Sequence, residues 1–143
     1  MSPKNKTIIN FNQLNLNPKI QKALVACDYD TPTTVQSKSI PEILAGKDVI
    51  VSAKTGTGKT AAFVLPALER LSQQASQKKP RVLILTPTRE LAAQILAASE
   101  KYGKFLHPKI VSLVGGVGYP QQIKALAKPV DIIVADRKST RLN

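Results

Sequence analysis

The sequence predicts an α/β protein in which helices flank a parallel β-sheet. Short runs of β-branched and other apolar residues occupy positions 48–52, 82–86, 110–114 and 130–134. Such runs, bounded by Gly or Pro, are typical of strands that are buried on both faces. Segments with helical spacing lie between them. Strands that alternate with helices in this way form parallel sheets through right-handed crossovers.

The first predicted helix precedes all of these strands. It opens at Asn17, a favourable N-cap, and Pro18 occupies its first turn. It runs to about Cys27, and a turn at residues 28–33 separates it from the next helical stretch.

Three further helices follow from the spacing of apolar residues. Residues 59–73 form the first, with Phe63 on its apolar stripe, and Pro66 is expected to kink or interrupt it. Residues 90–105 form the second amphipathic helix, and residues 121–128 a third, shorter one.

Length and composition restrict the class of protein. The chain has 143 residues, 43% of them hydrophobic, with one Cys and one His. It is one domain at most, and it lacks the cysteines for a disulfide framework or a Cys-based zinc site. The longest apolar run, residues 61–68, is far shorter than the ~20 residues that span a bilayer. The N-terminus has no apolar secretion signal. We therefore expect a soluble, cytoplasmic protein with no membrane partner.

The charge balance points to a polyanionic partner. Lys and Arg number 21 against 9 acidic residues, which gives a formal net charge of +12. Such a surplus favours nucleic acid as a partner, although solubility alone is the simpler alternative.

A glycine-rich segment, AKTGTGKT, follows the first predicted strand at residues 53–60. A turn between a strand and a helix start presents backbone N–H groups to an anion, and the helix dipole adds to this field. Lys59 supplies charge to the β and γ phosphates, and the Thr60 hydroxyl can ligate Mg²⁺. The segment is a Walker A loop with Ala53 in place of its usual first Gly. By itself it predicts a nucleoside triphosphate, which kinases, GTPases and helicases all bind.

A second signal lies upstream of this loop, in the stretch YDTPTTVQ. The Gln36 amide can pair with the N6 and N7 edge of adenine, and Tyr29 can stack on a base. Taken alone, these residues would be ordinary turn and helix-start residues. Their position beside the Walker A loop favours adenine binding.

With the motifs that follow, the chain resembles the opening of a DEAD-box ATP-dependent RNA helicase of bacterial type. Tyr29, Pro32, Thr33 and Gln36 match the family's Q motif, with the isolated upstream aromatic at Phe11. The stretch PTRELA at residues 87–92 matches the next motif letter for letter, and Gly115-Gly116 match a double glycine. Two positions depart from the pattern: Asp28 replaces the usual Gly, and Lys54 the usual Gln.

The resemblance implies a RecA-like P-loop NTPase domain that uses ATP and Mg²⁺, with Lys59 and Thr60 as catalytic residues and the Thr60 hydroxyl on the metal. It also implies RNA as partner, held through its sugar–phosphate backbone without sequence preference. The alternative for Arg89 and Glu90 is a plain helix N-terminus. The implied nucleotide contacts are Phe11, Tyr29, Gln36, Ala53, Lys54, Thr55, Gly56, Thr57, Gly58, Lys59 and Thr60. The implied RNA contacts are Pro87, Thr88, Arg89, Gly115 and Gly116.

The resemblance also divides the chain. We expect an N-terminal arm at residues 1–8, a Q-motif region at 9–37 and a partial helicase ATP-binding domain at 38–135, truncated before the Walker B strand. Residues 136–143 match the translation of a common sequencing-adapter oligonucleotide, so we expect them to be non-native; a real basic tail is the alternative. Without Walker B carboxylates and an arginine finger the 143-residue chain should not hydrolyse ATP, and it should be marginally stable. A short, non-catalytic nucleotide- and RNA-binding module remains open as an alternative, whereas Gln36 and PTRELA disfavour a small kinase.

Overall fold

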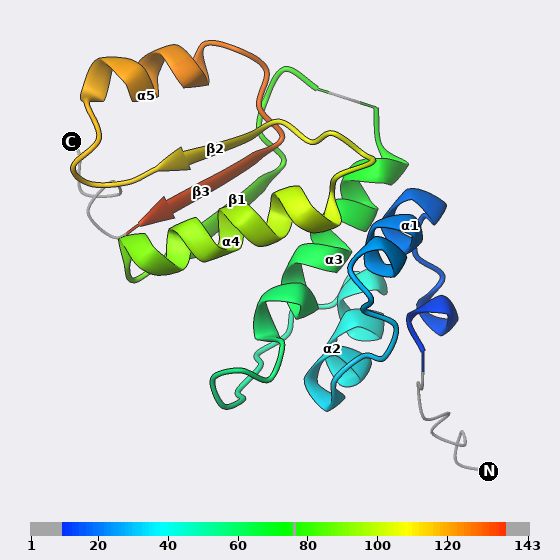
Figure 1. The fold of residues 1–143 in the computed structure, drawn as a ribbon. Helices are drawn as coiled ribbons and strands as arrows, with labels where there is room; N and C mark the ends of the chain where they lie inside the picture. Colours follow the sequence, from blue (N-terminus) through cyan, green and yellow to red (C-terminus); the bar gives the residue numbers. More distant parts are fainter. Residues whose placement is uncertain (1–9, 76, 137–143) are drawn as a thin grey trace.

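The computed structural model describes residues 10–75 and 77–136, and it contains the predicted parallel sheet. Strands β1 (Val82–Thr86), β2 (Ile110–Leu113) and β3 (Ile132–Asp136) form this sheet in the order β1-β3-β2, and both strand pairs are parallel (Figure 1). All three strands therefore end at the same edge. That edge is where two of the predicted motifs follow their strands.

One helix covers a face of this sheet. Helix α4 (Arg89–Tyr102) contacts all three strands, and Ala92 and Ile95 are its buried apolar residues. They pack in one core with Ile132 and Val134 of β3. The crossover from β1 to β2 is thus made by α4, a helix packed on one face of the sheet, as parallel strands require.

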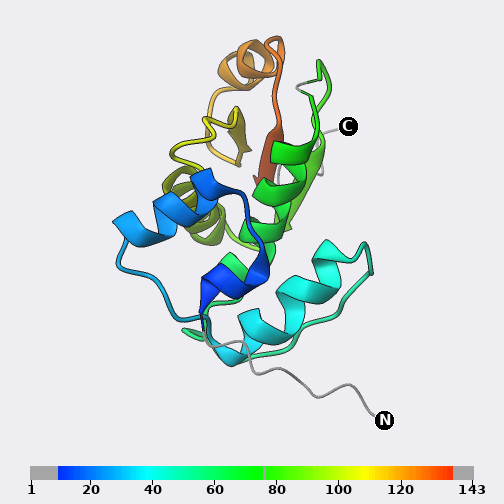
Figure 2. The same ribbon diagram turned by 90° about the vertical axis from the view of Figure 1, so that its right-hand side faces the viewer.

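The remaining core lies among helices on the far side of α4. A 3₁₀ helix (Phe11–Leu14), α1 (Pro18–Ala26), α2 (Thr34–Leu44) and α3 (Lys59–Gln73) form this group. Figures 1 and 2 show α3 between α2 and α4, and α1 beside α4. Asn17 caps α1 as predicted, because its side chain accepts a hydrogen bond from the Lys19 N–H. The buried side chains that join the helices include Ile20, Leu24, Ile40, Leu65 and Leu68.

Helix α5 (Tyr119–Leu126) stands beyond the β2 edge of the sheet (Figure 1). None of its residues is buried. No helix among the residues described here is long and apolar enough to cross a membrane.

The predicted strand at residues 48–52 is wrong. These residues have no regular structure, and Ile50 is fully exposed. A strand is defined by ladder bonds to a neighbour, and no described strand lies beside this segment. The apolar, β-branched sequence therefore leads into the glycine-rich loop as exposed chain.

Other elements are shifted or extended. Strand β3 begins at Ile132, two residues later than predicted, and includes Asp136. Helix α4 ends at Tyr102, before the predicted end at 105, because Gly103 forms its C-cap. Helix α3 has the predicted bounds and is not interrupted at Pro66. The prediction that Phe63 lies on the buried stripe is wrong, since it is 37% exposed.

Burial of the strands on both faces is also wrong for β1. Its exposure alternates, with Leu83 and Leu85 exposed at 63% and 61% while Thr86 is buried. Helix α4 covers one face, and no described helix covers the other face at β1. Of the predicted segment boundaries, 37/38 falls inside α2 and 135/136 inside β3, whereas residues 1–8 and 137–143 lie outside the described residues.

Candidate functional site

The glycine-rich loop leads directly into α3, as the sequence predicts. Gly56 and Gly58 have φ values of 83° and 81°, in the left-handed region that favours glycine. Gly58 is the N-cap and makes no side-chain cap hydrogen bond. The first N–H groups of an α-helix have no intrahelical acceptor, so the start of α3 can accept an anion.

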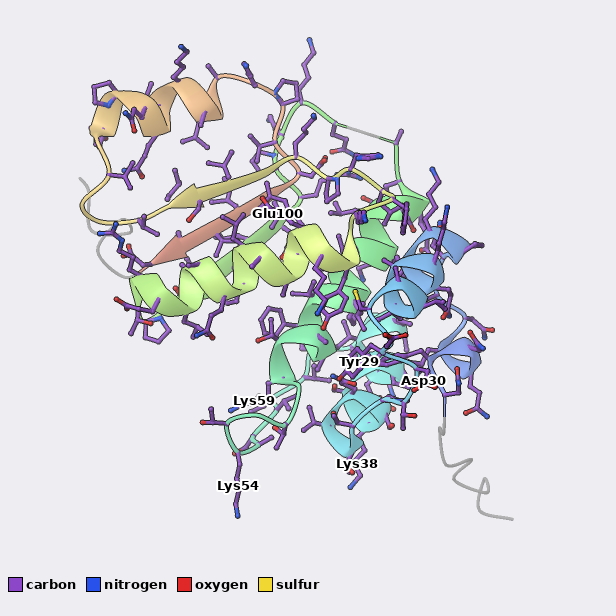
Figure 3. All side chains as sticks on the ribbon, in the orientation of Figure 1. Tyr29, Asp30, Lys38, Lys54, Lys59 and Glu100 are labelled. Atoms are coloured by element: carbon purple, nitrogen blue, oxygen red, sulfur yellow. The ribbon has the colours of Figure 1, made fainter. Side chains whose placement is uncertain are left out.

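The side chains of the loop are open to a ligand. Lys54 and Lys59 are exposed and Thr60 is half-buried. Figure 3 shows Lys54 at the tip of the loop, pointing away from the helices, and Lys59 at the start of α3. The loop is braced from within, because the Thr57 hydroxyl donates to the Lys54 carbonyl over 2.6 Å. Lys59 and Thr60 thus lie at the start of α3, whereas Lys54 lies at the tip of the loop, and their contacts with phosphate and Mg²⁺ stay predictions.

Gln36 links the upstream motif to this loop. Its side chain is fully buried, and its Nε2 donates to the Gly58 carbonyl over 3.0 Å and to the Tyr29 hydroxyl over 2.7 Å. Both N–H groups of the amide therefore already donate hydrogen bonds within the protein. Direct reading of adenine by Gln36 stays a prediction, and it requires these bonds to be exchanged.

Thr33 holds Gln36 in place. Thr33 matches the Q motif but is not one of the predicted site residues. The Thr33 N–H donates to Gln36 Oε1 over 3.0 Å, and the Thr33 hydroxyl accepts from the Gln36 N–H over 3.4 Å. This is a capping box at the start of α2. The pattern Thr-x-x-Gln at 33–36 is the sequence signal that could have revealed it.

The two predicted aromatic contacts lie together, but at different depths. Phe11 is 1% exposed, and its ring packs against the Tyr29 ring at a centroid distance of 5.1 Å. Tyr29 is half-buried and also stacks on Tyr102 at 6.3 Å. Burial, followed by the nearby Tyr29 and Cys27, raises the pKa of Tyr102 above its ordinary value. Phe11 therefore supports Tyr29 from behind, and its direct contact with a nucleotide stays a prediction.

A cavity of about 660 Å³ opens beside the loop. Its walls come from the start of α2 and from residues 49–53, with Ala53 and Thr57 at the loop side. This volume is in the range of small-molecule sites. Of the predicted nucleotide contacts, Ala53 and Thr57 line this cavity, whereas Tyr29, Gln36 and Lys59 do not.

The second group of predicted residues meets at the carboxyl edge of the sheet. A Cβ atom built on Gly116, whose φ is 86°, would come within 2.9 Å of the Arg89 guanidinium. The motif after β1 and the double glycine after β2 are therefore adjacent in space. The Gly115 N–H donates to the buried Asp136 carboxylate over 3.2 Å, which ties this corner to the end of β3.

Thr88 is the N-cap of α4, as expected from the alternative in which Arg89 and Glu90 form a plain helix N-terminus. Its hydroxyl accepts from the Leu91 N–H over 3.1 Å, and Glu90 lies in the first turn. Pro87, Thr88 and Arg89 are all exposed. The helix start and an RNA contact are compatible, because the cap uses only the Thr88 hydroxyl oxygen and leaves the Arg89 guanidinium at the surface.

The parallel α/β fold and the glycine-rich loop before α3 define a RecA-like P-loop protein. The family model "DEAD/DEAH box helicase" matches residues 33–142. The chain therefore belongs to the DEAD/DEAH box helicase family.

Individual relatives agree with this assignment. The chain is 42% identical over 131 residues to the ATP-dependent RNA helicase SrmB of Escherichia coli (strain K12), covering 90% of this chain and 30% of that protein. It is 45% identical over 134 residues to the ATP-dependent RNA helicase DRS1 of Eremothecium gossypii, covering 92% of this chain and 18% of that one. The chain thus spans less than a third of either relative.

Solved structures show the same fold. A DEAD box protein from Methanococcus jannaschii superimposes with a TM-score of 0.84 at 36% identity, covering 92% of this chain and 36% of that one. A hypothetical ATP-dependent RNA helicase from Sulfolobus tokodaii gives 0.77 at 38% identity, covering 87% and 35%.

Proposed function

We propose that this chain is the ATP-binding part, with some of the RNA-binding part, of an ATP-dependent RNA helicase of the cytoplasm. In the whole protein, RNA-stimulated ATP hydrolysis would drive local unwinding of RNA duplexes. Lys59 and the N–H groups at the start of α3 bind the phosphates. Mg²⁺, held by the Thr60 hydroxyl and by the phosphates, would neutralise charge on the γ phosphate.

The observation that carries this proposal is the bond between the Gln36 amide and the Gly58 carbonyl. Gly58 is the residue from which α3 starts, and α3 presents the phosphate-binding N–H groups. A change at Gln36 on nucleotide binding is therefore passed to the phosphate loop through one hydrogen bond. This gives the upstream motif a direct physical route to the site of hydrolysis.

RNA binding is assigned to the carboxyl edge of the sheet. The exposed Arg89 guanidinium beside Gly116 can contact a phosphate, and a glycine lets a sugar–phosphate backbone approach closely. Such contacts carry no base-sequence information. They weaken steeply with added salt, because each neutralised phosphate releases counterions.

We propose further that the 143-residue chain binds ATP without hydrolysing it. No Walker B carboxylate motif occurs in the 143 residues, and the loop at residues 53–60 and the first turn of α3 supply no acidic side chain in its place. A carboxylate that completes the Mg²⁺ shell is a recurring part of P-loop catalysis. We expect no phosphate release above background, with or without RNA; steady ATP turnover by the purified chain would refute this part of the proposal.

The test of adenine recognition is Gln36→Ala, measured as the affinity for ATP and for GTP. We expect ATP binding to weaken by about tenfold, in line with the ~1–3 kcal/mol of a bidentate amide–adenine contact. The ratio of the two affinities is the informative quantity, because the substitution also leaves the Tyr29 hydroxyl and the Gly58 carbonyl without their donor. Loss of stability lowers both affinities together, whereas loss of adenine recognition lowers only that for ATP.

A matched control is Gln122→Ala. The Gln122 amide also donates to two backbone carbonyls, those of Val114 and Val117, but it lies in α5. We expect this variant to bind both nucleotides normally. An equal loss of ATP and GTP in Gln36→Ala would show that Gln36 supports the loop without reading adenine.

A further inference from the structure

A groove of about 420 Å³ lies between α5 and β2, away from all the motifs discussed above. Its position is at the start of β2, whereas the double glycine follows the end of that strand. The lining residues are Lys109, Ile110, Val111, Gln121, Lys124, Ala125, Lys128, Pro129 and Val130.

The groove is open because α5 directs polar or small side chains towards the sheet and its large apolar side chains away from it. The residues of α5 that line it, Gln121, Lys124 and Ala125, are polar or small. The large apolar side chains of the same helix, Ile123 and Leu126, are instead exposed at 55% and 41%. Helical spacing places these two on the side opposite the groove. An amphipathic helix normally fills such a gap with its own apolar stripe, and α5 does not.

The floor and the rim of this groove differ in character. Val111 and Val130 supply an aliphatic floor, and Ile110, which also lines the groove, packs against the main core. The rim carries three lysines, Lys109, Lys124 and Lys128, and none of the described lining residues is acidic.

The carboxylate of Asp131, which follows the lining residue Val130 in the sequence, is already engaged elsewhere. Asp131 pairs with Arg81 over 3.0 Å and accepts from the Lys109 backbone N–H over 2.9 Å. The positive rim is therefore not neutralised by Asp131. A positive rim around an aliphatic floor is chemically suited to an anionic ligand that also has apolar groups.

We propose that this groove binds an acidic, amphipathic peptide segment of a partner protein. Aliphatic side chains of the segment occupy the floor, and its Asp or Glu carboxylates pair with the three lysines. The lining contains no aromatic ring on which a base could stack and no Arg to form a bidentate phosphate contact. These absences favour a peptide over an RNA strand.

The probe is a synthetic peptide with leucines one helical turn apart and flanked by glutamates. We expect it to bind the 143-residue chain in low salt and to lose affinity when its glutamates are replaced by glutamines. Exposed ion pairs are individually weak, so reversing two of them with Lys124→Glu/Lys128→Glu should weaken binding by about tenfold or more. Ala125→Gln tests the groove itself, because it adds bulk without charge and keeps a good helix former.

The matched control is Lys78→Glu/Lys79→Glu, which makes the same change in net charge on an exposed loop outside the groove. Circular dichroism confirms that each variant is folded. The proposal is overturned if the peptide does not bind, or if it binds the groove variants as it binds the control. It is also overturned if Lys124→Glu/Lys128→Glu weakens the binding of a single-stranded RNA oligonucleotide more than the binding of the peptide. The groove would then belong to the RNA-binding surface.

Discussion

At the scale of single residues, Gly56 and Gly58 share a backbone conformation but differ in their surroundings. Both have φ near +80°. A Cβ atom on Gly58 would collide with the Gln36 amide and also approach Thr33, whereas a Cβ on Gly56 would meet nothing within 4 Å. Gly58 is thus required twice, once for its φ and once for the close passage of Gln36.

We therefore expect Gly56→Ala and Gly58→Ala to have unequal costs. The left-handed backbone alone costs about 1–2 kcal/mol in each. Gly58→Ala should lose roughly a further 1–3 kcal/mol, because the Gln36 side chain must move out of a packed position. Urea denaturation of both variants measures the difference. Equal losses would mean that the Gln36 contact does not constrain the loop.

Asp28 occupies a position where the chain after α1 turns with φ of 53°. The positive φ is a physical reason for the Gly that the DEAD-box family usually has at this position. Asp tolerates the left-handed region better than most residues, but not as well as Gly does. Asp28→Gly should raise the free energy of unfolding by about 0.5–1 kcal/mol. The control is Asp30→Gly, a nearby exposed Asp without a positive φ, which should not stabilise the protein. A loss of stability in Asp28→Gly would contradict this explanation.

At the scale of secondary-structure elements, one ion pair holds the amino ends of the strands together. Arg81, just before β1, pairs with Asp131, just before β3, and their side chains are only 12% and 14% exposed. The Asp131 backbone carbonyl accepts from the Arg81 and Val82 N–H groups, and its carboxylate accepts from the Lys109 N–H before β2. All three strands are therefore joined at Asp131.

Removing one partner of such a pair leaves a charge in a site that excludes water. We expect Arg81→Met to lower the free energy of unfolding by about 3 kcal/mol. Arg81→Met/Asp131→Asn should lose less, because no buried charge is left unpaired. The exposed pair between Lys47 and Glu42 is the control, and Glu42→Ala should cost at most about 0.5 kcal/mol. Chemical denaturation tests all three, and equal small losses would show that burial does not strengthen the Arg81 pair.

The elements that could be predicted from the sequence are those with local signals. Residues 59–73 and 82–86 have the predicted bounds, and α1 has the predicted cap at Asn17. Residues 48–52 carry an equally good strand pattern, but whether they form a strand depends on a neighbour that no local pattern specifies. The direction in which the apolar side chains of α5 face is likewise not given by the sequence, since periodicity gives a stripe but not its direction.

The candidate site also has parts that could be predicted from local sequence signals and parts that could not. The phosphate loop and the start of α3 follow from glycine positions and a strand-to-helix context. The family resemblance implied only that Arg89 and Gly116 both contact RNA, and their approach to each other could not be predicted, because sequence separation says nothing about proximity. The burial of Gln36 could not be predicted. It depends on a capping box with Thr33 and on a carbonyl, that of Gly58, brought from another helix.

At the scale of the whole molecule, apolar side chains remain uncovered at two places, on strand β1 and in the segment before the glycine-rich loop. Leu83 and Leu85 project from β1, the outer strand of the described sheet, and Val49, Ile50 and Val51 are exposed in the segment before the loop. Exposed apolar side chains on an edge strand are a predicted site of aggregation. We therefore expect the chain to melt below about 50 °C and to aggregate as it does so.

The uncovered face makes a specific prediction about threonine substitutions in the sheet. Leu83→Thr/Leu85→Thr should change the free energy of unfolding by no more than about 0.5 kcal/mol, because both side chains are already mostly in water and Thr suits a strand. The same substitutions should reduce light scattering at a given protein concentration. Val134→Thr, on the neighbouring strand β3, is the contrasting variant. It changes shape little but buries a hydroxyl at a fully buried position, and it should cost about 1–3 kcal/mol. A double variant destabilised as much as Val134→Thr would show that the β1 face is covered in solution. Aggregation of the chain would then have to be caused by a different surface.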